Sequence, residues 1–261
     1  MKEQPSRISP DAETEALIRD AFMSAAVNRH ETALRLLEDA IRVRPELAEL
    51  YLAKAATLDR MGRFADALAC CDQAMEEGVQ HSDLSYMKGL ALHRLGHFQP
   101  SLDLLREAAI VDPHHAEIWY MMGNCYFSLR DFECAIDCFE RAMELNPKAA
   151  KACYNRGVAL EELERLEEAL FYYEEYLRMN PEDAAIGNNI GVCLARLGHL
   201  EAALERFDGV LAINPENAYA LNNRGMILQR MGRTEEAEIC YERAREILKG
   251  RDRTGSILSE R

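Results

Sequence analysis

Prolines recur at a constant interval through most of this 261-residue sequence. Four of them are equally spaced along the chain: Pro113, Pro147, Pro181 and Pro215. Pro45 lies two such intervals before the first of these, and the missing member of the series falls at Val79. A period of this size indicates stacked copies of one supersecondary unit, because a single unit of that length cannot bury its own apolar surface.

The prolines divide residues 14–251 into units of equal length without any insertion or deletion. The seven units are 14–47, 48–81, 82–115, 116–149, 150–183, 184–217 and 218–251, between an N-terminal extension (1–13) and a C-terminal tail (252–261). The eighth position of every unit is small: Ala21, Ala55, Gly89, Gly123, Gly157, Gly191 and Gly225. Two helices approach closely only where side chains are small, so we predict that the two helices of each unit, A and B, cross at this position.

The fourth unit carries a recognisable pattern of large and small residues. It is formed by Trp119, Met122, Gly123, Tyr126, Ala135, Phe139, Ala142 and Pro147. This pattern resembles the tetratricopeptide repeat (TPR), and the resemblance extends over residues 14–251. It implies an all-α fold, an α-solenoid in which seven 34-residue helix–turn–helix repeats wind into a right-handed superhelix with the A helices on its concave side. It also implies a protein-interaction scaffold.

Charge and hydropathy exclude several classes of partner. The chain has 45 acidic and 31 basic residues, a formal net charge of -14, which argues against binding to nucleic acid or to an anionic membrane surface. No window of eighteen consecutive apolar residues is present, so we expect no membrane span. The first residues lack the apolar core of a secretory signal, so we expect a cytoplasmic location.

Eight cysteines raise the question of a metal or redox site. Cys70, Cys138 and Cys240 occupy one position of the repeat, which favours a role as small apolar filler and no bound metal. The alternative is a soft-metal site formed by Cys125, Cys134 and Cys138. No phosphate-binding loop, dinucleotide fingerprint or hydrolase motif is present, so we expect no cofactor and no enzymatic activity.

The resemblance assigns positions 2, 5, 6, 9, 12 and 13 of each A helix to the concave side. The apolar residues that we predict to bind a partner there are Tyr86, Met87, Tyr120, Met121, Phe127 and Tyr154. The predicted amide-bearing contacts are Asn124, Asn155, Asn188, Asn189, Asn222 and Asn223. The alternative for the tyrosines is that they pack between adjacent A helices.

Asn155, Asn189 and Asn223 recur at the sixth position, which resembles the asparagine ladder in the repeat domain of O-GlcNAc transferase. An amide both donates and accepts, so such a ladder holds the backbone of an extended peptide whatever its side chains. This requires amides that point into an open groove without protein partners. The alternative is that they bond the adjacent A helix. A carboxylate clamp of the co-chaperone type is a poor match, since its two asparagines are present but its three cations are missing.

The sequence therefore predicts a scaffold or adaptor that binds a peptide or helical segment of another protein in its concave groove. The alternative is self-assembly as a homo-oligomer through the C-terminal repeat. Only a short tail follows the last unit, too short for a capping helix. Ile239, Ile247 and Leu248 would then have little cover, and uncapped terminal repeats tend to associate.

Overall fold

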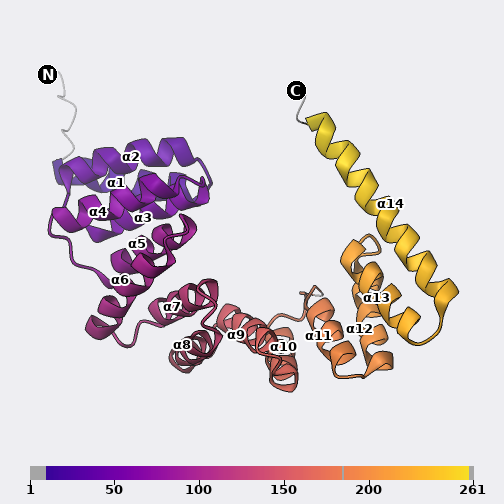
Figure 1. The fold of residues 1–261 in the computed structure, drawn as a ribbon. Helices are drawn as coiled ribbons and strands as arrows, with labels where there is room; N and C mark the ends of the chain where they lie inside the picture. The colour runs from indigo at the N-terminus through magenta and orange to yellow at the C-terminus, as the bar shows by residue number, and fades with distance from the viewer. Residues whose placement is uncertain (1–9, 184, 259–261) are drawn as a thin grey trace, which may run out of the picture. The chain divides into compact units, whose positions relative to one another are not determined.

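The structure is a computed structural model that describes residues 10–183 and 185–258, with side chains described for 14–183 and 185–249. Over the described residues it contains fourteen α-helices and no strand (Figure 1). They are α1 (Pro10–Ala26), α2 (His30–Val43), α3 (Ala48–Arg60), α4 (Phe64–Glu76), α5 (Ser82–Arg94), α6 (Phe98–Val111), α7 (Ala116–Ser128), α8 (Phe132–Leu145), α9 (Ala150–Glu162), α10 (Leu166–Met179), α11 (Ile186–Arg196), α12 (Leu200–Ile213), α13 (Ala218–Arg230) and α14 (Thr234–Leu258). This confirms the predicted all-α solenoid of helix–turn–helix repeats.

The helix bounds follow the predicted units with two differences at the ends. The A helices α3, α5, α7, α9 and α13 begin at the first residue of a predicted unit. The first helix instead begins at Pro10, inside the expected extension, since a proline in the first helical turn loses no hydrogen bond. The last helix continues to Leu258, inside the expected tail, where no proline stops it. The boundaries of the seven units themselves remain a prediction.

Each A helix ends in a tight turn with a left-handed residue at position 15 of the unit. Glycine occupies this position in four units, with φ between 71° and 89°: Gly62, Gly96, Gly198 and Gly232. In the second unit the amide of Arg63 then donates back to the carbonyl of Leu58, 2.9 Å away. This bond satisfies a carbonyl at the helix end, and it turns the chain back so that helix B packs on helix A.

The chain forms two compact units, Met1–Leu145 and Asn146–Arg261. In the third to seventh repeats the two helices pack at the glycine of position 8. A Cβ atom on Gly123 would lie 2.5 Å from the ring of Phe139, and one on Gly157 would lie 2.7 Å from the ring of Tyr173. The aromatic residue in helix B therefore packs directly on the backbone of helix A. This geometry confirms the predicted crossing point.

Successive A helices are linked by contacts between residues about one repeat apart. The guanidinium of Arg60 donates to the carbonyl of Ala25 (3.4 Å), and that of Arg230 donates to the carbonyl of Ala195 (3.0 Å). His93 bonds the hydroxyl of Ser128 at 3.0 Å. All these groups stand at positions 12 and 13, which the resemblance assigned to the concave side. At these junctions the polar groups therefore bond neighbouring repeats.

Candidate functional site

The thiols belong largely to the packed interior. Of the eight free cysteines, only Cys134 is half-buried and the others are buried. Burial raises the pKa of Cys138 to about 12, so its thiol stays protonated at neutral pH and is a weak nucleophile. The Cys125 thiol donates to the hydroxyl of Ser101 at 3.2 Å. Among the described residues no group of three or more histidine, cysteine, aspartate or glutamate side chains could hold a metal ion.

The predicted apolar contacts in the first compact unit are largely built into packing. Met121 is 3% exposed and belongs to the buried core, so its predicted position in an open groove is wrong. The half-buried ring of Tyr120 lies 6.0 Å from that of Phe139. Met87 is half-buried and packs against the core of the first repeats. At position 6 of these two repeats a long apolar side chain is therefore packed against the core.

Two further aromatic residues of the predicted set also have partners within the chain. Tyr86 is stacked on the ring of His115, with centroids 6.3 Å apart. The Nε2 atom of His115 lies 2.5 Å from a carboxylate oxygen of Asp83, which fixes the imidazole beside the tyrosine. Phe127 packs edge-on against Phe132 at 5.3 Å. Each of these two aromatic residues is half-buried and presents only part of its surface.

In the second compact unit a polar network occupies one of the predicted amide positions. Asn189 lies near the hydroxyl of Tyr173, which donates to a carboxylate oxygen of Glu161 at 2.8 Å. Arg196 pairs with the other carboxylate oxygen of Glu161 at 3.2 Å. Burial, and then the charge of Glu161, hold the pKa of Tyr173 above its usual range. The expectation that Asn189 points into open groove without a protein partner is therefore wrong.

The remaining asparagines differ in how accessible they are. The side-chain oxygen of Asn188 is buried and has no hydrogen-bond partner among the described residues, so it does not line an open surface. Asn124, Asn155 and Asn223 are half-buried, and Asn222 is exposed. Tyr154 is half-buried between two tyrosine rings of α10. Asn222 on α13 is therefore the most exposed of the predicted amides.

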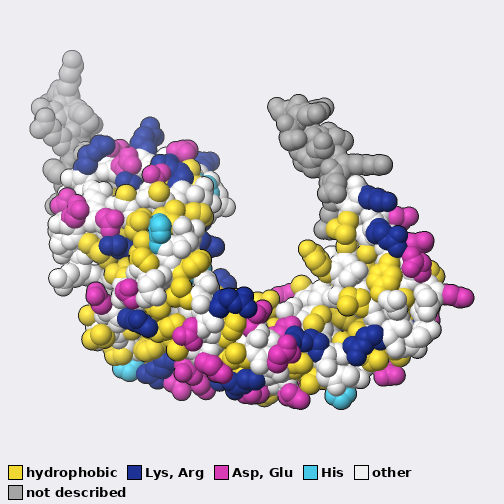
Figure 2. All heavy atoms as spheres, in the orientation of Figure 1, with side chains coloured by type: hydrophobic (Ala, Val, Ile, Leu, Met, Phe, Trp, Pro, Cys, Tyr) yellow, Lys and Arg dark blue, Asp and Glu magenta, His cyan; other side chains and the backbone are white. Residues whose placement is uncertain are grey.

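One face of α13 is exposed and combines apolar and amide side chains. Tyr219 is 77% exposed and Met226 is 51% exposed. Asn222 lies between them, and its amide is 3.7 Å from the sulfur of Met226. Figure 2 shows hydrophobic side chains on the surface of the C-terminal helices. The prediction from sequence omitted Tyr219 and Met226. They stand at positions 2 and 9 of this repeat, so listing all six concave positions would have included them.

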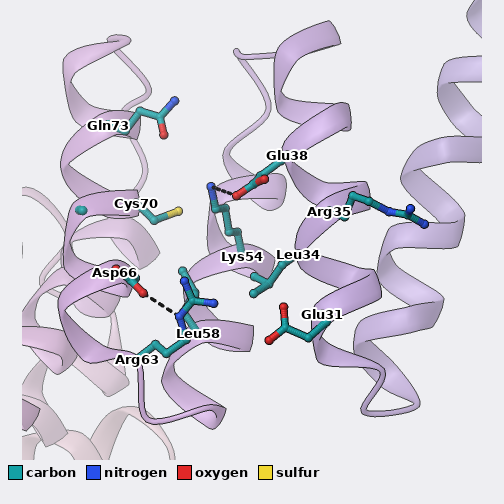
Figure 3. A pocket seen from close by; sticks show the side chains of 11 residues that line it. Glu31, Leu34, Arg35, Glu38, Lys54, Leu58, Arg63, Asp66, Cys70 and Gln73 are labelled. Carbon is teal, nitrogen blue, oxygen red and sulfur yellow. Dashed lines mark hydrogen bonds and ion pairs between the residues drawn. The ribbon is translucent and has the colours of Figure 1, made fainter.

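A cavity of about 390 Å³ lies among α2, α3 and α4, away from the concave positions (Figure 3). Two ion pairs line it. Lys54 lies 3.1 Å from Glu38, and Arg63 lies 2.6 Å from Asp66. Burial raises the pKa of Cys70, whose sulfur faces this cavity, to about 11. Because these charges are paired and the thiol is protonated, we interpret this cavity as a gap in the packing between repeats.

The repeat pattern is matched by known families. Four models described as tetratricopeptide repeat match residues 25–90, 86–137, 122–188 and 182–250, which together span most of the chain. The chain belongs to the tetratricopeptide repeat family. No curated protein sequence matches this TPR protein.

Several solved TPR structures are similar to this TPR protein. A tetratricopeptide repeat protein from Parabacteroides merdae has a TM-score of 0.65 at 18% identity and covers 90% of this chain and 93% of its own. The Cut9–Hcn1 hetero-tetramer of APC/C has a TM-score of 0.71 at 18% identity, covering 82% of this chain and 42% of that one. At such identities the likeness shows the fold alone.

A third similar structure is YrrB, described as a TPR protein with an unusual peptide-binding site. It has a TM-score of 0.50 at 25% identity and covers 81% of this chain and 91% of its own. The TPR fold is typical of non-catalytic scaffolds that mediate protein–protein interaction. No helix in the described part of this TPR protein is long and apolar enough to cross a membrane.

Proposed function

We propose that this TPR protein is a scaffold or adaptor of the cytoplasm that binds a peptide or helical segment of another protein along its A helices. It performs no catalysis and needs no cofactor, and its partners are neither nucleic acids nor membranes. The net charge of -14 supports a protein partner over a phosphate backbone. The peptide-binding site of the similar protein YrrB supports a peptide as the bound segment.

The exposed face of α13 is the observation that carries this proposal. Tyr219, Asn222 and Met226 are spaced so that they share one side of the helix. Exposed tyrosine and methionine supply adaptable apolar contact, and they are common at recognition surfaces. The amides of Asn222 and Asn223 are placed beside them to bond a peptide backbone. This combination suits a peptide better than a small molecule, because it is spread along a helix.

The other residues that we predicted to contact a partner contribute less to binding in this proposal. Asn155 and Tyr154 on α9 add contact area within the second compact unit, and Asn124 on α7 adds contact area within the first. Asn189 contributes indirectly, because it orients Tyr173 and through it Glu161. Salt should weaken binding only slightly, since neutral amides and apolar side chains make the main contacts.

Affinity capture from cell lysate with quantitative mass spectrometry tests the α13 surface. We expect Tyr219→Ala/Met226→Ala to reduce capture of the specific partners by tenfold or more, since exposed anchors of this kind carry on the order of 2 kcal/mol. Asn222→Ala/Asn223→Ala should lose about 1 kcal/mol per amide bond, or roughly fivefold each. The matched control is Phe171→Ala on α10, an aromatic residue that is 53% exposed outside the concave positions. If both double variants capture the same partners as Phe171→Ala, the proposal fails.

Self-assembly through the C-terminal repeat is the second candidate function, and exposed side chains on α14 favour it. Ile239 is 64% exposed and Leu248 is 49% exposed. Ile247 packs against the small cluster formed by Ala218, Leu221 and Ala244, so it is partly covered. Two large aliphatic side chains remain that a second copy of the chain would bury.

Light scattering after size exclusion measures this second candidate directly. We expect the wild type to exceed the monomer mass of 29.6 kDa as concentration rises, and Ile239→Glu/Leu248→Glu to remain at that mass. Burying two carboxylates without partners costs several kcal/mol, which is enough to dissociate a modest interface. The control Phe171→Ala should associate like the wild type. A wild type that stays monomeric at every concentration excludes this function.

A further inference from the structure

A cavity of about 820 Å³ opens at the junction of the second and third repeats. Its walls come from the end of α4, the loop and first turn of α5, and the C-terminal half of α6. The apolar part of this wall is Met75, Val79, Leu104 and Val111. None of the lining residues stands at a concave position or belongs to α13. Its volume is in the range of ligand pockets.

The cavity exists because position 4 of the third repeat is Ser85. The same position holds a large side chain in four other repeats, namely Leu17, Tyr51, Trp119 and Leu221. Tyr51 and Leu221 are buried, and Trp119 is half-buried against the core of its repeat. In these repeats the side chain at position 4 occupies space that Ser85 leaves open.

Two other repeats also have a small residue at position 4, but their neighbours compensate for it. A Cβ atom on Gly187 would lie 2.6 Å from a methyl group of Val210, which fills that site. Cys153 is fully buried, and its thiol donates to the carbonyl of Tyr172 at 3.2 Å. The third repeat has Ala108 where the sixth has Val210, so nothing within it replaces the missing side chain.

Trp119 shows how an aromatic ring fits this position. Its indole Nε1 donates to the carbonyl of Pro113 at 3.0 Å. Val79 stands one repeat before Pro113, as Ser85 stands one repeat before Trp119, and Val79 lines the cavity. An indole ring that entered from outside would therefore meet apolar walls.

The charged residues that line the cavity indicate which residues would flank such a ring in a partner protein. Glu107 and Asp112 are lining residues, while His81 is the lining side chain able to carry positive charge. These carboxylates complement lysine or arginine next to the entering residue. We propose that this cavity binds the indole ring of a tryptophan within a basic segment of a partner protein. The bound tryptophan takes the place that Trp119 fills in the following repeat.

Calorimetric titration with two blocked tripeptides tests this site. The wild type should bind Lys-Trp-Lys with one-to-one stoichiometry, and roughly tenfold or more tighter than Lys-Ala-Lys, because the ring is the anchor. Ser85→Trp fills the cavity from within, so it should abolish this binding and raise the melting temperature, as cavity filling commonly does. The matched control Ser85→Ala leaves the cavity open and should bind within about twofold of the wild type.

A second variant keeps the test decisive if Ser85→Trp folds poorly by circular dichroism. Glu107→Lys reverses an exposed charge at the cavity and should weaken Lys-Trp-Lys several-fold while the fold is unchanged. The variant Tyr219→Ala/Met226→Ala should bind the tripeptide like the wild type, which separates this site from the surface on α13. Equal affinity for the two tripeptides overturns the proposal. So does binding that survives the filled cavity or is lost with the α13 variant.

Discussion

Gly157→Leu is expected to lower the melting temperature by more than any other single substitution described for this protein. A Cβ atom at this position would lie 2.7 Å from the ring of Tyr173 and 3.4 Å from the carbonyl of Ala169. Tyr173 is fully buried and bonded to Glu161, so its ring has little freedom to move away. Overpacking of this kind costs about 1–3 kcal/mol, and the rest of the leucine side chain raises the cost further.

The same substitution at Gly209 is the matched control, because this residue is an exposed glycine within a helix. A Cβ atom there would have no neighbour within 4 Å. Gly209→Leu should therefore stabilise the protein by roughly 0.5–1 kcal/mol, since leucine has the higher helix propensity. Thermal unfolding followed by circular dichroism measures both variants. An unchanged melt for Gly157→Leu would show that A and B helices do not cross at position 8.

Alkaline pH is expected to destabilise this protein steeply, starting near pH 9. Burial raises the pKa of Cys70 and Cys153 to about 11 and the pKa of Cys71, Cys138 and Cys193 to about 12. In the unfolded chain these thiols ionise near pH 9. Below that pH both states hold the protons and stability is complete. Above it only the unfolded state releases them, so the free energy of unfolding falls as pH rises.

Each such thiol contributes at most about 1.4 kcal/mol per pH unit between its unfolded and folded pKa. Urea unfolding at intervals from pH 7 to pH 11 measures the slope of the free energy of unfolding. Cys71→Ala should show a shallower slope above pH 9 and the same slope as the wild type below pH 8. Equal slopes for the two proteins above pH 9 would mean that this thiol ionises in the folded state as easily as in the unfolded chain.

The repeating positions of the sequence predicted those features that depend on contacts within one unit. The start of most A helices and the crossing at Gly123 and Gly157 follow from local rules, as does the left-handed turn that the structure adds. Backbone conformation and the size of one side chain decide them, and both recur in every unit. The burial of most cysteines follows in the same way, because helix B turns the same face to helix A in each repeat.

Only the tertiary structure decided which concave residues are accessible. Met121 is buried and Asn189 lies near the Tyr173 hydroxyl, although both stand at the same position as the half-buried Asn223. A position in the repeat determines the face of a helix, whereas exposure depends on the size and polarity of the neighbours that meet there.

The same distinction explains the two surfaces that the sequence did not single out. Tyr219 and Met226 on α13 are exposed because the described residues place no side chain over them. The cavity at Ser85 is lined by residues of three helices, α4, α5 and α6. Val210 fills the space beside the small residue Gly187, whereas the third repeat has no such large neighbour beside Ser85. Periodicity reports what the repeats share. Binding surfaces arise where they differ, and the difference takes effect only when neighbouring helices are packed together.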